Sequence, residues 1–272
     1  MSLIVNYNSA AFDAHRNMLN TDRSMQTSIA HLSSGLRINT AADDPAGLVI
    51  ANSLQTQGQG LGQAIKNSND SINLVKTGEG ALNEVTNLLQ EMRTLAVHAA
   101  NAGVNSTADV AADQAQYNNA AASIDRIAST TKFNGKALLD GTFTSQTFQI
   151  GANASDTVSL SITNQSSTTL GVNGLNLSTG AGAAITALDS AISTVSTTRA
   201  TLGSFQKDTL QTTVNSLSVA QENLQASESN IRNADMASEM ANYTQQNILM
   251  QAGTAMLAQA NQAPQAVLQL LR

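Results

Sequence analysis

The chain contains no cysteine and no tryptophan, and only two of its 272 residues are proline. The lack of cysteine excludes disulfide bonds and thiolate metal sites. Aromatic residues make up 3% of the sequence, although 42% of the residues are hydrophobic. A core of this composition has to be built from Ala, Leu, Ile, Val and Met, which is typical of closely packed helices rather than of an aromatic-rich enzyme core.

Charge is sparse and mostly of one sign. The 13 Lys and Arg residues are outnumbered by 19 Asp and Glu residues, which gives a net charge of −6. A sequence-independent nucleic-acid surface requires clustered Lys and Arg, so we expect no nucleic-acid binding. No apolar run approaches the length of a membrane span, so we expect no membrane insertion. The first eight residues lack the basic and apolar regions of a secretory signal peptide, so any export should use another route.

Sequence signatures of catalytic, metal and cofactor sites are also absent. His15, His31 and His98 form no His-Glu-x-x-His metal motif, and there is no phosphate-binding loop or Gly-x-Ser-x-Gly nucleophile elbow. The carboxylates of Asp43 and Asp44 could be an acid–base pair, but they directly precede a proline and a helical pattern, which favours helix capping. We therefore predict that the chain is not an enzyme and binds no cofactor or metal.

Hydrophobic residues recur with helical spacing at both ends of the chain, and each set predicts one long helix. The apolar stripe near the N-terminus, here called the N-terminal seam, contains Ile4, Ala11, Met18, Met25, Ile29, Leu32 and Leu36. Alternating four- and three-residue steps at the other end are typical of a coiled coil. This C-terminal seam contains Met236, Met240, Tyr243, Met250, Leu257, Leu268 and Leu271.

The two seams could pack on each other within one molecule, but that pairing would not cover all apolar residues of the two helices. Their outer faces still carry Val5, Phe12, Leu19, Ile248 and Leu249. A lone helix cannot shield such a stripe from water, so each apolar face needs a partner. We therefore predict that both seams are polymerisation surfaces.

Helical patterns also cover residues 61–99, 110–130 and 185–231, and the first of them shifts in phase near Gly78 and Gly80. Residues 132–182 differ, because apolar and polar residues alternate there at 148–150 and 158–162, which indicates short strands. The predicted fold is mainly α. It is a long, coiled-coil-like helical bundle rod with a small β-hairpin-rich tip at about 132–182, and the N- and C-terminal helices are paired at one end.

Several long motifs closely resemble bacterial flagellin. They include LSSGLRINTAADDPAGL at 32–48, GEGAL at 78–82, SESNIRNADM at 227–236 and AMLAQANQAPQ at 255–265. The resemblance covers roughly residues 1–135 and 185–272. It implies a structural subunit that self-assembles into the extracellular bacterial flagellar filament for swimming motility.

The resemblance also implies domains and partners. Residues 1–43 and 233–272 correspond to the filament's inner tube, and residues 44–232 to a helical spoke domain. The family is exported through the flagellum's type III channel without a cleaved signal peptide, and a chaperone holds the C-terminal helix before export. The subunit itself, the hook–filament junction proteins and the cap protein are the other implied partners. Only about fifty residues separate the helical arms, which implies a thin, smooth filament without outer variable domains.

A further implied partner is the innate immune receptor Toll-like receptor 5. In the family this receptor reads the helix that corresponds here to Gln90, Glu91, Leu95 and His98, together with Gln116. Recognised flagellins commonly carry Arg at the position of Glu91 and Glu at the position of Gln116. The charge reversal at Glu91 weakens the expectation that the receptor binds this chain.

Two other functions remain as alternatives. A hook–filament junction protein shares both terminal helices, although its tail usually lacks the AQANQAPQ run seen at 258–265. A secreted adhesive helical protein could use the Ser/Thr-rich residues of 132–182 to bind surfaces. A flagellin that carries a protease would need an inserted domain and a His-Glu-x-x-His motif, and this sequence has neither.

Overall fold

The computed structural model describes residues 8–270, with side chains as far as Gln262. Its contacts divide the chain into two compact units. Unit 1 consists of the residues up to Thr56 and from Asn223 onward, and unit 2 consists of Gln57–Glu222. Six α-helices and a π-helix account for most of the described residues, and none of these helices is long and apolar enough to cross a membrane. The predicted α class is therefore confirmed.

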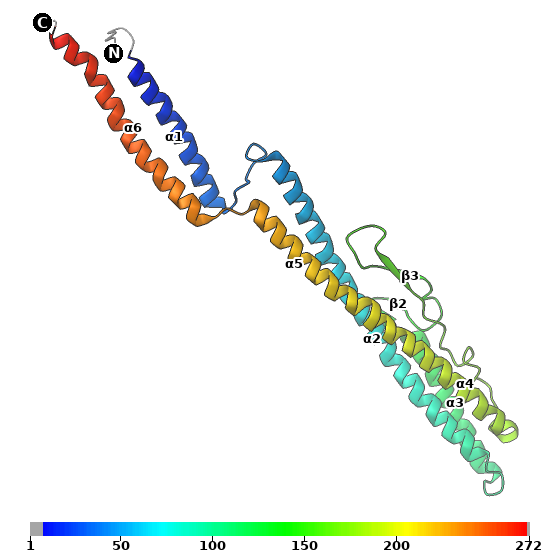
Figure 1. Cartoon of the computed structure of the whole chain (residues 1–272). Helices are drawn as coiled ribbons and strands as arrows, with labels where there is room; N and C mark the ends of the chain where they lie inside the picture. Colours follow the sequence, from blue (N-terminus) through cyan, green and yellow to red (C-terminus); the bar gives the residue numbers. More distant parts are fainter. Residues whose placement is uncertain (1–7, 271–272) are drawn as a thin grey trace. The chain divides into compact units, whose positions relative to one another are not determined.

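Unit 1 is built on two antiparallel helices, α1 (Ser9–Ser34) and α6 (Met236–Leu270), which lie side by side (Figure 1). The Asn8 side chain caps α1 by accepting a hydrogen bond from the Ala11 amide at 3.1 Å. Gly35 ends the same helix in the left-handed conformation, with φ 72°, where glycine carries no steric penalty. The predicted pairing of the terminal helices is confirmed.

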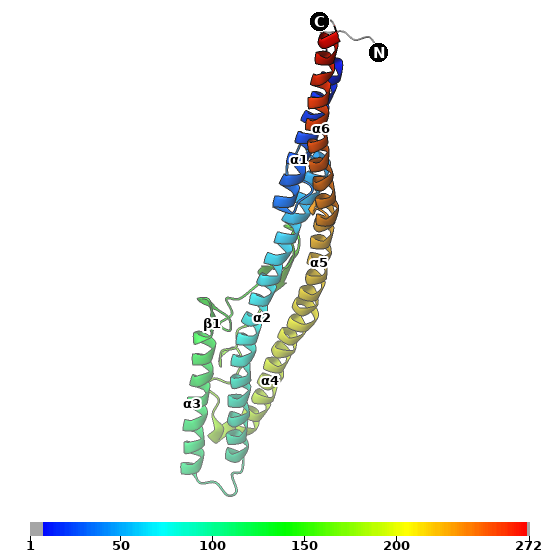
Figure 2. The ribbon, with the colours of Figure 1, turned by 90° about the vertical axis from the view of Figure 1, so that its left-hand side faces the viewer.

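Unit 2 is a helical bundle (Figure 2). Helix α2 (Pro45–Ala99) enters it from unit 1, and α3 (Thr107–Thr130) packs against α4 (Leu177–Ser204). A π-helix, η1 (Phe205–Gln211), joins α4 to α5 (Thr212–Arg232). The core consists mainly of Leu, Val, Ile and Ala, as the composition predicted.

The buried face of α2 repeats every seven residues without interruption. One row of buried positions is 64, 71, 78, 85, 92 and 99, and a second is 68, 75, 82, 89 and 96. Gly78 lies on the first row, while Gly80 is exposed. The predicted phase shift near these glycines is therefore wrong for the core-facing residues, because the partly exposed neighbours that produced it lie beside the buried rows.

The segment between α3 and α4 contains two antiparallel hairpins. Strands β1 (Lys132–Phe133) and β2 (Lys136–Ala137) flank a turn in which Asn134 and Gly135 have φ of 47° and 80°. Positive φ at both positions is the signature of a tight type I′ hairpin turn. Strands β3 (Gln146–Gln149) and β4 (Thr157–Leu160) pair with Gln146 opposite Leu160.

The hairpins lie along the flank of the bundle instead of capping its far end (Figure 2). The Asn67 side chain of α2 donates a hydrogen bond to the Gln149 carbonyl at 3.2 Å, and the ring of Phe148 lies 6.2 Å from that of Phe205. The turn between α2 and α3 forms the end of the bundle. Phe148 of β3 and Val158 and Leu160 of β4 explain this position, since they pack in or against the core of the bundle.

The predicted inner-tube and spoke boundaries lie close to breaks between helices. Helix α1 ends at Ser34 and α2 begins at Pro45, while α5 ends at Arg232 and α6 begins at Met236. By contacts, however, residues 44–56 and 223–232 belong to unit 1 together with the two terminal helices. The division at 43/44 and 232/233 stays a prediction.

Candidate assembly surface on the terminal helices

The α1–α6 interface follows a heptad pattern on both helices. On α1 the half-buried or buried positions include 11, 14, 18, 21, 25, 28 and 32, and on α6 they include 239, 243, 246, 250, 253, 257 and 260. Seam residues therefore alternate with small or polar ones, such as Ala14 and Ser28 on α1 and Gly253 on α6. Such small residues let two helices approach closely, and a Cβ on Gly253 would lie 3.9 Å from that of Met18.

The structure describes the side chains of eleven predicted seam residues and places seven of them in this interface. The members of the two seams on its half-buried positions are Ala11, Met18, Met25, Leu32, Tyr243, Met250 and Leu257. Leu36 is half-buried just beyond the end of α1. Ile4 and Leu271 lie outside the described residues, and the side chain of Leu268 is not described.

Three predicted seam residues, Ile29, Met236 and Met240, are exposed instead. Ile29 follows the inward position of Ser28 and Met240 follows that of Glu239, so each is rotated out by about 100°. For Ile29 and Met240 the pattern of apolar residues did not reveal this, because the neighbouring inward positions hold the polar residues Ser28 and Glu239. These three residues take no part in packing α1 on α6, and their predicted role in polymerisation stays a prediction.

An apolar face remains on the outside of the helix pair. We call the following residues the outer apolar face, and they are between 45% and 64% exposed: Phe12, Leu19, Ile29, Met236, Met240, Ile248, Leu249 and Met256. The predicted exposure of Phe12, Leu19, Ile248 and Leu249 is confirmed, while Val5 lies outside the described residues. Clusters of exposed apolar side chains mark interaction sites in soluble proteins.

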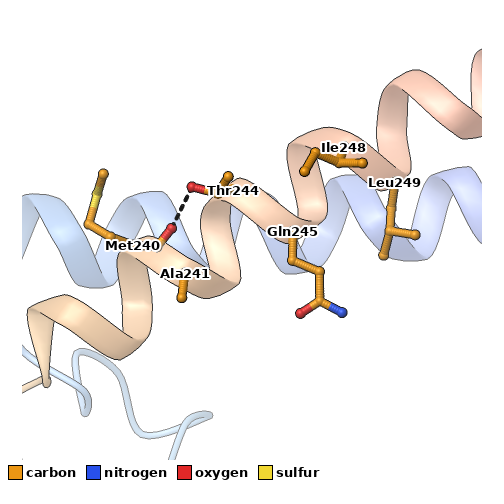
Figure 3. Close-up of a pocket in the computed structure, with 6 residues that line it drawn as sticks. All are labelled: Met240, Ala241, Thr244, Gln245, Ile248 and Leu249. Atoms are coloured by element: carbon orange, nitrogen blue, oxygen red, sulfur yellow. Dashed lines mark hydrogen bonds between the residues drawn. The ribbon is translucent and has the colours of Figure 1, made fainter.

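On α6 this face forms a shallow groove (Figure 3). Its lining residues stand in two rows with a spacing of one turn, Met240–Thr244–Ile248 and Ala241–Gln245–Leu249. The Thr244 hydroxyl donates a hydrogen bond to the Met240 carbonyl at 2.8 Å. This bond satisfies the only polar group of the first row internally, so the row presents an apolar surface.

A clasp of main-chain hydrogen bonds fixes the register of α1 on α6. The Arg37 amide donates to the Arg232 carbonyl at 2.7 Å, and the Ala234 amide donates to the Gly35 carbonyl at 3.0 Å. The guanidinium of Arg37 also donates to the Ile231 carbonyl at 2.6 Å. Sequence reasoning missed the clasp, although both of its segments lie within motifs that carried the family resemblance.

The two aspartates before α2 have structural partners. Asp44 accepts a hydrogen bond from the Gly47 amide at 2.9 Å, which confirms the predicted capping role for this residue. The carboxylate of Asp43 accepts bonds from the Thr40 amide at 2.8 Å and the Asn39 amide at 3.0 Å. These bonds lower the pKa of Asp43, because they stabilise the charged carboxylate.

The predicted receptor-facing residues lie in unit 2. Gln90, Glu91, His98 and Gln116 are exposed, while Leu95 is half-buried against the core. The His98 Nδ1 atom lies 2.7 Å from a carboxylate oxygen of the buried Asp113, which joins α2 to α3 close to Gln116. This hydrogen bond raises the pKa of His98, because the carboxylate stabilises the imidazolium.

The described residues contain no group of three or more side chains that could hold a metal ion. The structure shows two other features. The α1–α6 pair has little buried surface of its own, and an apolar face remains on the outside of that pair. These features are typical of helical structural proteins whose exposed apolar surface needs a partner.

Comparison with known proteins specifies the family. Residues 5–144 match the bacterial flagellin N-terminal helical region, and residues 185–271 match the C-terminal helical region. A flagellin of Halalkalibacterium halodurans is 46% identical over 99% of this chain and 100% of the relative. A flagellin of Bacillus subtilis is 42% identical over 98% of this chain and 99% of the relative.

A solved structure agrees with these relatives. The crystal structure of Bacillus cereus flagellin is 33% identical and superimposes with a TM-score of 0.51 over 56% of this chain and 88% of that one. The chain belongs to the bacterial flagellin family, and it is a structural subunit of the extracellular flagellar filament. Its relatives match it over nearly their full length, which agrees with the predicted short form.

Proposed function

We propose that the outer apolar face is the surface through which copies of this chain assemble into the filament. The observation that carries this proposal is the exposure of eight large apolar side chains on the two terminal helices. Burying such a side chain completely contributes about 1.5–3 kcal/mol, and roughly half of each is still available. The eight together give a gross gain on the order of 6–12 kcal/mol, from which the costs of association are subtracted.

The two seams have a supporting role in this proposal. The residues that pack between α1 and α6 hold the two helices at one register, so each helix presents its exposed apolar residues in a fixed position relative to the other helix. The groove between the helices adds to this surface, since it is lined by small residues such as Ala10, Ala14 and Ala252 and can accept a helix of another copy at short range.

The test is a pair of matched charge substitutions. Ile248 on the outer apolar face is 60% exposed, and Val219 in unit 2 is 59% exposed. Ile248→Lys should abolish polymerisation, because it would place a desolvated ammonium group in the assembled interface. Val219→Lys should leave polymerisation intact, and circular dichroism should show both monomers folded. Sedimentation and electron microscopy measure the polymer. Normal filaments from the Ile248→Lys protein would contradict the proposal.

We further propose that the export chaperone binds the groove of α6 shown in Figure 3, before the groove is covered by other subunits. Membership of the flagellin family supports this partner, and it also supports export through the flagellar type III channel and contact with the cap and hook–filament junction proteins. Leu249→Lys should then reduce binding of the chaperone to the purified chain in a titration. Unchanged affinity would place the chaperone elsewhere.

We also propose that Toll-like receptor 5 recognises this chain poorly. Glu91 and Gln116 are exposed on α2 and α3, so a change of charge at either position is presented directly to a protein that covers this surface. The double substitution Glu91→Arg with Gln116→Glu should increase receptor activation by the monomer. Equal activation by the two proteins would contradict this proposal. The same family membership supports a structural role without catalysis.

A further inference from the structure

The helix that returns through unit 2 changes its register by one residue. In α4 the buried residues Leu188, Val195 and Leu202 are spaced by seven. Below them Leu210 is buried and Leu217 is half-buried, again with a spacing of seven. Leu210, however, follows Leu202 by eight residues. The return helix therefore contains one residue more than a continuous heptad pattern allows.

The opposing helix has no matching insertion. Ser68, Val75 and Leu82 of α2 are fully buried with a constant spacing of seven across the same region. A Cβ on the buried Gly78 would lie 3.9 Å from Leu202, so this level of α2 directly faces the start of the change. The extra residue therefore has to be absorbed within the return helix alone.

The π-helix η1 accommodates the extra residue of the return helix. A π-helix closes its hydrogen bonds over five residues instead of four, so it accommodates one additional residue without breaking the chain of bonds. At its start the Phe205 amide points between the carbonyls of Thr201 and Leu202. At its end the Thr212 hydroxyl donates to the Lys207 carbonyl at 3.2 Å, which satisfies a main-chain acceptor in the wider turn.

The contacts beyond η1 depend on this change of register. The Gln221 side chain of α5 donates to the Gly58 carbonyl of α2 at 3.5 Å, and its nitrogen would lie 3.0 Å from a Cβ on Gly62. Around η1 itself the fit is poorer, since the side-chain oxygen of Gln206 is buried and finds no hydrogen-bond partner among the described residues. An unsatisfied buried polar atom is destabilising, so the π-helix is retained at some cost.

We propose that η1 is a register joint, a one-residue insertion that sets the rotation of α5 about its own axis and can convert to α-helix. Conversion would rotate α5 by about 100° relative to α4. This inference concerns a conformational device within unit 2, and it stands independently of the assembly surface proposed above.

Single-residue deletions in the full-length monomer test the joint. Deleting the exposed Asp208 places Leu210 seven residues after Leu202, so η1 should become α-helix with the core intact, and the melting temperature should stay within about 3 °C of the parent. Asp208→Asn controls for the lost charge. Asn83 is an exposed residue of α2, where the heptad spacing has no extra residue. Deleting Asn83 should lower the melting temperature by about 10 °C or more, or prevent folding. Equal effects of the two deletions would overturn the proposal.

Hydrogen exchange provides a second, independent measurement on the same proteins. In the parent chain the amides of residues 205–211 should exchange faster than those of the adjoining turns in α4 and α5, because conversion of η1 to α-helix breaks the main-chain hydrogen bonds of the π-helix. In the Asp208 deletion this fast segment should disappear. Uniform protection across residues 195–220 in the parent would show that η1 is a fixed element and would overturn its proposed conversion.

Discussion

The bundle of unit 2 and the α1–α6 pair of unit 1 use the same helical residues with opposite results. In unit 2 the side chains of Leu82, Leu89 and Met92 are completely buried. In the described parts of α1 and α6 the only buried side chain is that of Ser28, although the two helices are rich in Leu, Ile and Met. Three or more helices can enclose a core, whereas two helices cover only one stripe on each other.

This difference teaches that burial depends on the number of neighbours more than on composition. Unit 2 carries its own core, so its stability should be independent of other copies of the chain. The α1–α6 pair leaves its outer apolar face in water and should gain much of its stability from other subunits. This contrast between unit 2 and the α1–α6 pair can be tested directly.

Hydrogen exchange should show the largest effect. In the isolated subunit the amides of α1 and α6 should exchange about a hundredfold faster than those around Leu82 and Leu89 in α2, a gap of roughly 2.7 kcal/mol. In the filament the gap should close, since the outer apolar face is then covered. Mass spectrometry of the two states measures both values. Equal protection of both regions in a dilute subunit would refute the contrast.

A pair of substitutions should separate folding from assembly. Leu89→Ala empties a fully buried position and should destabilise unit 2 by about 2–5 kcal/mol, as measured by thermal unfolding of the monomer. Met250→Lys puts a charge into the half-buried seam of the α1–α6 pair. It should block polymerisation in sedimentation experiments while the melting temperature of unit 2 stays unchanged. Loss of stability in both monomers would show that the two units fold as one.

Much of this architecture could be predicted from the sequence, because apolar side chains mark buried helix faces directly. The terminal helices, the paired seams and the β3–β4 hairpin follow from the periodicity of apolar residues. Sequence patterns did not show that Ile29 and Met240 lie outside the α1–α6 interface, because the polar residues Ser28 and Glu239 occupy the inward positions next to them. Hydrophobic periodicity cannot detect an interface position that is not hydrophobic.

Other features depend on interactions that no local pattern records. The clasp between the segments near Arg37 and Arg232 is made mostly of main-chain atoms, which are the same in every sequence. The one-residue insertion at η1 is visible in the spacing of Leu202 and Leu210. It can be recognised as an insertion only when α2 is known to have no matching extra residue. The position of the hairpins beside α2 likewise follows from tertiary contacts such as that between Asn67 and Gln149.

The smallest expected effect is a pH dependence confined to unit 2. The pKa of His98 is raised above the ordinary histidine value of 6.5, first by its hydrogen bond to Asp113 and then by the charges of Asp113 and Asp109 on α3. A raised folded-state pKa means that protonated His98 stabilises the bundle, fully below pH 6.5 and progressively less as the pH rises through the folded-state value. The melting temperature of unit 2 should therefore fall slightly across this window. His98→Gln should remove this fall in the melting temperature, whereas His31→Gln, in unit 1, should leave it unchanged. If the melting temperature of the His98→Gln protein fell by the same amount, another group would be responsible for the pH dependence.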